Sequence, residues 1–292
     1  MSKTKEASTS GESVKLLLMI AMTASVVSDS PALDASKSLP TSSVTISYSA
    51  PTHRITFHEP VIITFRVVNQ TGLPINLDLG QDRKRGFLIA ITKPDGVKIE
   101  FPVLVHEGIS IPGEVLVKSG ETFTHDLLIN EWFDFPLPGK YHIEIHLSKP
   151  IAENNGSLYE TDPGFRTVVE IGPRDELALA KTCNDLANQI EASHEYQQAA
   201  DAARTLSYVE DPIAVPYLRR ALLAGKLVQS LAINALEKLA NIAAVGVLIE
   251  SLKVESVGDD RVLARHALER IQSKTTDKNL WQEIDRALAG DL

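Results

Sequence analysis

The chain has 292 residues, 43% of them hydrophobic, and a formal net charge of −9 at pH 7. This length is enough for two cores of ordinary domain size. Its 29 basic residues are outnumbered by 38 acidic ones, and phosphate neutralisation needs an excess of cations, so we predict no nucleic-acid binding.

The first 43 residues are predicted to be a signal-peptide-like segment with a flexible lead-in. Lysines precede an uncharged apolar run at 16–27, and a serine-rich stretch follows it. The run is too short to cross a bilayer as a helix, so we expect no stable membrane span after signal removal. The sequence therefore predicts export to the periplasm or the exterior. A chain whose apolar run is not a signal would remain cytoplasmic.

Residues 44–172 alternate β-rich runs with turns that contain glycine or proline. The runs are rich in β-branched and aromatic residues, which is typical of strands. The clearest of them are 61–68, 87–91, 123–129 and 141–147. Roughly seven to nine short strands of this kind predict an antiparallel β-sandwich.

Short motifs in this region carry a family resemblance. The sequence PGKY at 138–141 resembles the glycine-x-tyrosine entry of immunoglobulin-like and macroglobulin-like domains, in which the tyrosine hydroxyl ties a corner. Together with the turn motifs at 67–71, 94–96 and 119–123, it is also similar to the proteinase-inhibitor domain family first seen in bacilli. The resemblance implies an immunoglobulin-like architecture. It also raises an alternative function, protease inhibition through loops such as 101–117.

One cluster in the strand region has possible chemistry. His142, Glu144 and His146 alternate along a predicted strand, so they share one face. Two imidazoles and a carboxylate could bind zinc, which would make the chain a metal-dependent enzyme. The favoured interpretation is a polar strand face turned to water, because one face of a sandwich strand must meet solvent. We therefore predict no metal and no cofactor.

Residues 173–292 contain a degenerate repeat. The segment 214–222 recurs as 244–252, and Ala232 and Ala235 recur as Ala264 and Ala267. A weaker, earlier copy contains Ala199, Ala202 and Leu206. The copies are 30 to 33 residues apart. A period of this length predicts helix pairs stacked as an α-solenoid.

The best repeat unit opens with a helix-start signal. Asp211 is expected to cap a helix whose first residue is Pro212, and Pro216 is expected to kink that helix about one turn in. With the second helix at 232–239, the unit resembles the HEAT family or the related bilin-lyase-type repeat, over roughly 195–273. The family resemblance implies a scaffold that binds proteins.

The expected fold is therefore an N-terminal β-sandwich (44–172) followed by a short C-terminal α-solenoid of HEAT-like repeats (173–292). No phosphate loop, serine elbow or paired-cysteine site is found, and Cys183 is expected to be a buried apolar residue. We predict a non-enzymatic module that binds a protein partner in the bacterial cell envelope or outside it. In HEAT proteins the second helices line the concave side, which implies these binding residues: Asn234, Lys238, Arg265, His266 and Arg270.

Overall fold

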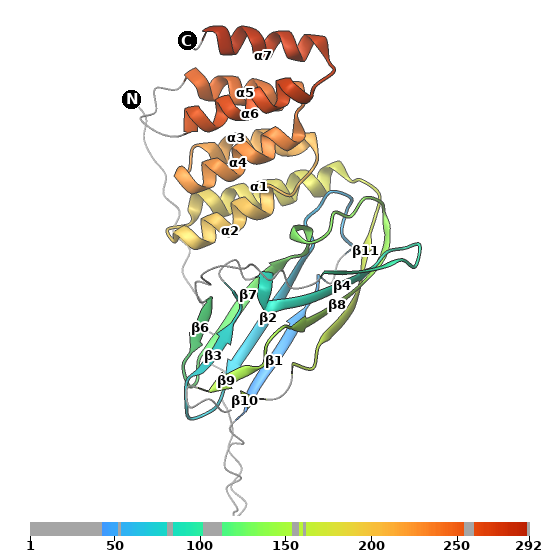
Figure 1. Ribbon diagram of the computed structural model, residues 1–292, viewed down its shortest axis with the longest axis vertical. Helices are drawn as coiled ribbons and strands as arrows, with labels where there is room; N and C mark the ends of the chain where they lie inside the picture. Colours follow the sequence, from blue (N-terminus) through green and yellow to red (C-terminus); the bar gives the residue numbers. More distant parts are fainter. Residues whose placement is uncertain are drawn as a thin grey trace, which may run out of the picture. The chain divides into compact units, whose positions relative to one another are not determined.

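The computed structural model describes residues 43–51, 54–80, 84–101, 113–153, 158–159, 162–253 and 260–290. The apolar run predicted to be a signal lies outside these residues. Ser42–Leu292 form one compact unit. Its fold is mixed, because the described residues form antiparallel sheets up to Ile171 and seven α-helices from Glu176 onward (Figure 1).

The strands of the described part of the chain form three antiparallel sheets. Each sheet joins segments far apart in the sequence, and an isolated parallel bridge links Ile55 to Ile171. In spatial order the first sheet contains β1 (Val44–Ser49), β2 (Ile62–Asn69) and β7 (Thr122–Leu128). The second contains β10 (Leu158–Tyr159), β9 (Ile151–Glu153), β3 (Ile75–Asp78) and β6 (Glu114–Val117). The third contains β11 (Phe165–Ile171), β8 (Gly139–Leu147), β4 (Phe87–Thr92) and β5 (Lys98–Phe101).

Strand β8 shows the predicted alternation. Tyr141, Ile143 and Ile145 are buried, whereas His142 and His146 are exposed. The Tyr141 hydroxyl donates a hydrogen bond of 2.7 Å to the backbone carbonyl of Leu137. The tyrosine tie expected at this corner is therefore present.

Large side chains fill the core between the strands. Phe65 is fully buried, and its ring centroid lies 5.1 Å from that of Phe87, 5.2 Å from that of Tyr48 and 6.4 Å from that of Phe123. Aromatic rings at these separations add attraction to the apolar burial. Phe65 therefore joins strands of the first sheet to β4 of the third.

The helices pack in pairs and in two rows (Figure 1). Three pairs are consecutive in sequence, α1 with α2, α3 with α4 and α5 with α6, and α7 packs against α5 and α6. The first row contains α1 (Glu176–Ala192), α3 (Val215–Leu222), α5 (Ile242–Lys253) and α7 (Lys278–Gly290). The second contains α2 (Tyr196–Leu206), α4 (Lys226–Leu239) and α6 (Asp260–Lys274).

The repeated alanines occupy matching places in the second row. Ala202 in α2, Ala235 in α4 and Ala267 in α6 are all buried in one apolar core. An alanine leaves room for a close approach between helices, because larger side chains would overfill a closely packed interior. The recurring alanines of the repeat therefore mark the positions at which the helices of the second row pack closely.

The start of the best repeat unit differs from the expectation in one respect. Asp211 does cap the helix, accepting a 3.0 Å hydrogen bond from the backbone N–H of Ile213, and Pro212 follows as the first residue. The turn that begins at Pro212 is a 3₁₀ turn, however, and α3 starts only at Val215. Pro216 therefore lies in the first turn of α3, where its missing N–H costs no helical hydrogen bond, rather than in a helix interior.

The next unit begins with a different cap. Its sequence has Asn241-Ile242-Ala243 in place of an Asp-Pro pair. The Asn241 side chain accepts a 2.9 Å hydrogen bond from the backbone N–H of Ala244, and α5 begins at Ile242. Asparagine is a favourable N-cap residue, so Asn241 replaces the aspartate of the preceding unit.

Polar contacts join the segment before β2 to the first helix and to the connection that precedes that helix. The Thr56 hydroxyl donates to the carbonyl of Pro173 (2.9 Å) and accepts from the N–H of Asp175 (2.7 Å). The Thr182 hydroxyl of α1 donates to a Glu59 carboxylate oxygen at 3.1 Å. These bonds hold α1 against the chain segment that precedes β2.

Candidate functional site

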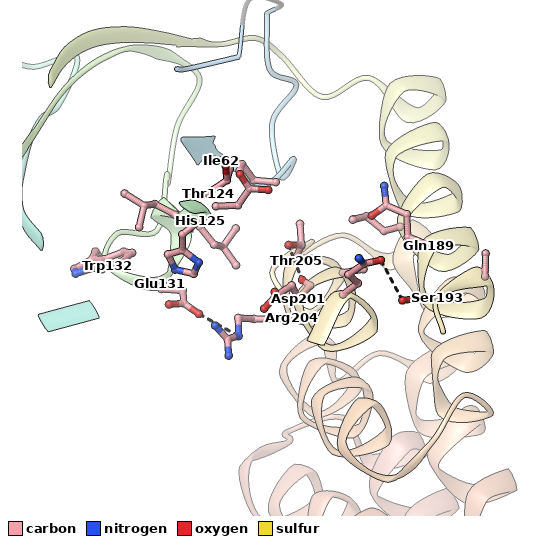
Figure 2. A pocket seen from close by; sticks show the side chains of 17 residues that line it. Ile62, Thr124, His125, Glu131, Trp132, Gln189, Ser193, Asp201, Arg204 and Thr205 are labelled. Atoms are coloured by element: carbon pink, nitrogen blue, oxygen red, sulfur yellow. Dashed lines mark hydrogen bonds and ion pairs between the residues drawn. The ribbon is translucent and has the colours of Figure 1, made fainter. Parts of the chain in front are cut away.

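A cleft of about 620 Å³ lies between strand β7 and the helices α1 and α2 (Figure 2). One wall comes from five consecutive residues, 124–128, and from Glu131 and Trp132, which follow β7. The opposite wall comes from the last turns of α1 and from α2, including Gln189 and Arg204. Pockets of 300–1,000 Å³ are typical ligand sites, so the cleft is large enough for part of a peptide.

An ion pair crosses the cleft. A guanidinium nitrogen of Arg204 on α2 lies 3.7 Å from a carboxylate oxygen of Glu131, whose side chain is only 10% exposed (Figure 2). The other two carboxylates of the cleft accept hydrogen bonds from neutral groups. Asp126 accepts from the Thr64 hydroxyl (2.7 Å), and Asp201 accepts from the Gln197 amide (2.9 Å). Three carboxylates therefore face one guanidinium, and the cleft is acidic.

A second, smaller pocket of about 290 Å³ lies between α4 and α6. We call it the α4–α6 groove; its lining includes Glu237, Lys238, Arg270 and Lys274. Arg270 makes two hydrogen bonds, 2.7 and 2.6 Å, to the carboxylate of Glu237. The Lys238 ammonium lies 4.7 Å from the ring centroid of Tyr208, a cation–π contact. The ion pairs of the described residues include neither Lys238 nor Lys274, so the groove has excess positive charge.

The structure brings together only some of the predicted binding residues. Lys238 and Arg270 line the α4–α6 groove, whereas Asn234 and His266 are exposed on the same helices outside its lining. Arg265 is half-buried and pairs with Glu269 at 3.3 Å. The prediction did not include Lys274, although it follows Arg270 by one helical turn and therefore shares its face.

In the cluster on β8, Glu144 pairs with cations from two other strands of the same sheet, β5 and β11. Glu144 pairs with Lys98 at 3.0 Å and with Arg166 at 3.4 Å. The hydrogen bond from Lys98 is the main cause of a pKa of Glu144 below its usual value. Among the described residues, no group of three or more His, Cys, Asp or Glu side chains is placed to hold a metal ion. His142, Glu144 and His146 thus share a face but form a salt-bridged surface.

Other expectations from the sequence have simpler outcomes. Cys183 is fully buried, as expected, and its burial raises the pKa of the thiol to about 12, so a reactive thiolate is disfavoured. Most of the loop proposed for protease inhibition, 102–112, lies outside the described residues. No described helix combines the length and apolar character needed to cross a membrane.

No family model matches the chain. No curated protein matches it either. A Bordetella pertussis protein provisionally named ApaA is 14% identical over 44% of this chain and 92% of its own, with a TM-score of 0.26. A Listeria innocua β-glucosidase is 11% identical over 46% of this chain and 16% of its own, with a TM-score of 0.25. The α2-macroglobulin of E. coli is 11% identical over 85% of this chain and 18% of its own, with a TM-score of 0.23. Similarities at these scores support no conclusion about fold or function.

Proposed function

We propose that the chain is a non-enzymatic protein-binding module of the bacterial cell envelope or exterior. In this proposal residues 44–172 are an immunoglobulin-like β-sandwich and residues 173–292 are a short HEAT-like α-solenoid. The antiparallel sheets and the paired helices in two rows support this architecture. The apolar run at 16–27 supports the destination.

The α4–α6 groove is the observation that carries the binding function. It has two cations outside any described ion pair, Lys238 and Lys274, in a chain whose net charge is −9. A cationic groove attracts an anionic segment of a partner, whereas the acidic remainder of the chain repels acidic surfaces that cannot enter the groove. The proposed partner is therefore a protein with an exposed acidic segment.

The groove is also partly organised before binding. Glu237 holds Arg270 through two hydrogen bonds, and the Tyr208 ring holds Lys238. Side chains that are already held lose less conformational entropy when a partner binds. The remaining cation, Lys274, is exposed and can reach toward an acidic residue of the partner.

The proposal is tested by capture from a cell-envelope extract with three forms of the tagged full chain. The first is the unchanged chain, the second carries Lys238→Glu and Lys274→Glu, and the third carries Lys278→Glu and Arg286→Glu. The last two substitutions lie on α7 and make the same change in net charge. We expect the unchanged chain and the α7 variant to capture the same partner protein from the extract. The groove variant is expected not to capture it. A set of retained proteins that is the same for all three forms, or is reduced equally in both variants, would contradict the proposal.

A further inference from the structure

Strand β7 is an edge strand of its sheet. The sheet order is β1-β2-β7, and within the described residues β7 pairs only with β2. The register matches Ile62 with Leu128 and Val68 with Thr122. An edge strand has one row of backbone N–H and C=O groups that no neighbouring strand uses.

The flanking hydrogen bonds show which residues of β7 have outward backbone groups. The N–H of Ile129 donates to the carbonyl of Val61 at 2.8 Å, and the N–H of Asn69 donates to the carbonyl of Glu121 at 3.0 Å. In an antiparallel pair the hydrogen-bonded positions alternate, so the odd-numbered residues of β7 face β2. The N–H and C=O groups of Thr124 and Asp126 therefore point away from β2, and both residues are exposed.

The open edge lies in the cleft of about 620 Å³. A cleft over the face of a sheet would touch alternate residues, but five consecutive residues of β7, 124–128, line this one. These residues span about 14 Å of strand, which matches an extended segment of about five residues. Leu186 and Ala202 add apolar surface on the helical wall, and Gln189 and Thr205 add polar groups (Figure 2).

The charges of the cleft select among possible extended segments. Asp126 and Asp201 both line the cleft, and their hydrogen-bond donors, Thr64 and Gln197, are uncharged. The one guanidinium of the lining, that of Arg204, is paired with Glu131. A basic side chain would therefore gain attraction at this edge, whereas an acidic one would be repelled.

We propose that an extended peptide with basic side chains binds in this cleft and adds a strand to the open edge of β7. The outward groups of Thr124 and Asp126 would pair with the backbone of the peptide. The carboxylates of Asp126 and Asp201 would favour lysine or arginine. The site is independent of the α4–α6 groove, because the two pockets share no residue.

The test is an NMR titration of the ¹⁵N-labelled chain with three synthetic hexapeptides. The first has lysine at alternate positions between threonine and valine, the second has glutamate in place of lysine, and the third is the lysine peptide with N-methylated backbone amides. We expect only the first to shift the amide signals of 124–128 and of α2 at about 1 mM peptide. Equal shifts with all three peptides, shifts confined to α4 and α6, or no shifts would overturn the proposal.

Variants of the edge make the test specific. Thr124→Pro removes an N–H that points into the cleft but leaves the bonds to β2, a position where edge strands tolerate proline. Loss of one backbone hydrogen bond is expected to weaken the lysine peptide roughly fivefold. Thr122→Pro is the matched control, because Thr122 is on the same strand edge but does not line the cleft. An equal effect of both proline variants would contradict an edge site in the cleft.

A charge variant serves if the proline variants do not fold. Asp201→Asn removes a carboxylate from the cleft and is expected to weaken the lysine peptide roughly threefold. Asp285→Asn is its control, since Asp285 also lies on a helix and accepts a hydrogen bond from a glutamine amide, that of Gln272. Equal affinity for the lysine peptide in wild type and Asp201→Asn would contradict the proposal that the carboxylates of the cleft select basic side chains.

Discussion

The strand region and the helical region of this chain satisfy their backbone hydrogen bonds in different ways. Each helix satisfies its backbone hydrogen bonds within itself, so the α4–α6 groove can bind a partner only through side chains such as Lys238 and Lys274. A sheet forms its backbone hydrogen bonds between strands. Its edge strand therefore has N–H and C=O groups that point away from the sheet, as at Thr124 and Asp126. In the two proposals the regions therefore bind different partners, one recognised by charged side chains and the other by an extended backbone.

The cores of the two regions also differ in how far apart in the sequence the residues that fill them lie. The strand core depends on large residues from distant segments, with Phe65 among three other aromatic rings. The helical core depends on alanines and leucines that recur at a regular spacing, such as Ala202, Ala235 and Ala267. The most extensive packing of described elements stays within one region or the other. The comparison predicts two regions that can lose stability separately.

The largest expected effect comes from the strand core. Phe65→Ala is expected to lower the free energy of unfolding of the strand region by about 3–5 kcal/mol, because it leaves a cavity among packed rings. The chain has two tryptophans, Trp132 after β7 and Trp281 in α7, so each region has its own fluorescent reporter. In urea, the midpoint reported by Trp132 should fall while that reported by Trp281 stays the same.

Single-tryptophan variants separate the two signals. Trp281→Phe leaves only Trp132, and Trp132→Phe leaves only Trp281. Val97→Ala serves as the control for Phe65→Ala, since Val97 is 50% exposed and its truncation should change the free energy of unfolding by less than about 0.5 kcal/mol. Equal shifts of both reporters would show that the two regions unfold as one cooperative unit.

An intermediate effect is expected at a long-range contact of the helical region. Asp211 is 2% exposed and accepts hydrogen bonds from the Arg174 guanidinium, which lies before α1. The hydrogen bonds from Arg174 are the main cause of a lowered pKa of Asp211. Asp211→Asn is expected to cost about 2 kcal/mol of unfolding free energy at pH 7, because it removes charge-assisted hydrogen bonds.

The pH dependence checks the cause of that effect. A lowered pKa in the folded state stabilises the fold above the unfolded pKa of about 3.9, and this stabilisation is lost as the pH falls through the folded pKa. The difference between wild type and Asp211→Asn should therefore be largest near neutral pH and shrink below about pH 4. Urea unfolding followed through Trp281 measures it. A difference that does not change with pH would assign the cost to the altered hydrogen-bond geometry of the buried side chain rather than to the lost charge, since asparagine can still cap the helix.

The smallest expected effect comes from a local contact of the strand region. Tyr141→Phe keeps the buried ring and removes the hydroxyl that donates to the Leu137 carbonyl. One hydrogen bond contributes about 1 kcal/mol of unfolding free energy. The Trp132 midpoint in urea should fall slightly and the Trp281 midpoint should not change. A loss as large as that of Phe65→Ala would mean that the corner organises the whole strand region.

Periodic patterns made several features predictable from the sequence. Alternation in β8 predicted that His142, Glu144 and His146 share a face, and the recurring alanines marked buried positions in the second helical row. Asp211 and Pro212 marked a helix start because capping depends on adjacent residues. The position of Pro216 was predicted less well, because a 3₁₀ turn moved the start of α3 next to it.

The candidate sites were less predictable, because they join residues from distant segments. Lys98 and Arg166 reach Glu144 only through strand pairing, and both form ion pairs with it. The cleft was missed altogether, since no pattern within β7 or within α2 shows that the two elements face each other.

The sequence by itself determined which face of β8 is buried, which alanines recur in the second helical row, and that a helical turn begins after Asp211. Local spacing decides these features, because a strand alternates its side chains and a helix repeats them with each turn. Only the tertiary structure decided that β7 lies at the edge of its sheet within the described residues, that 124–128 line a cleft with α1 and α2, and that Lys238 and Arg270 share a groove. The reason is physical: the order of strands and the contacts between helices depend on packing between segments far apart in the chain.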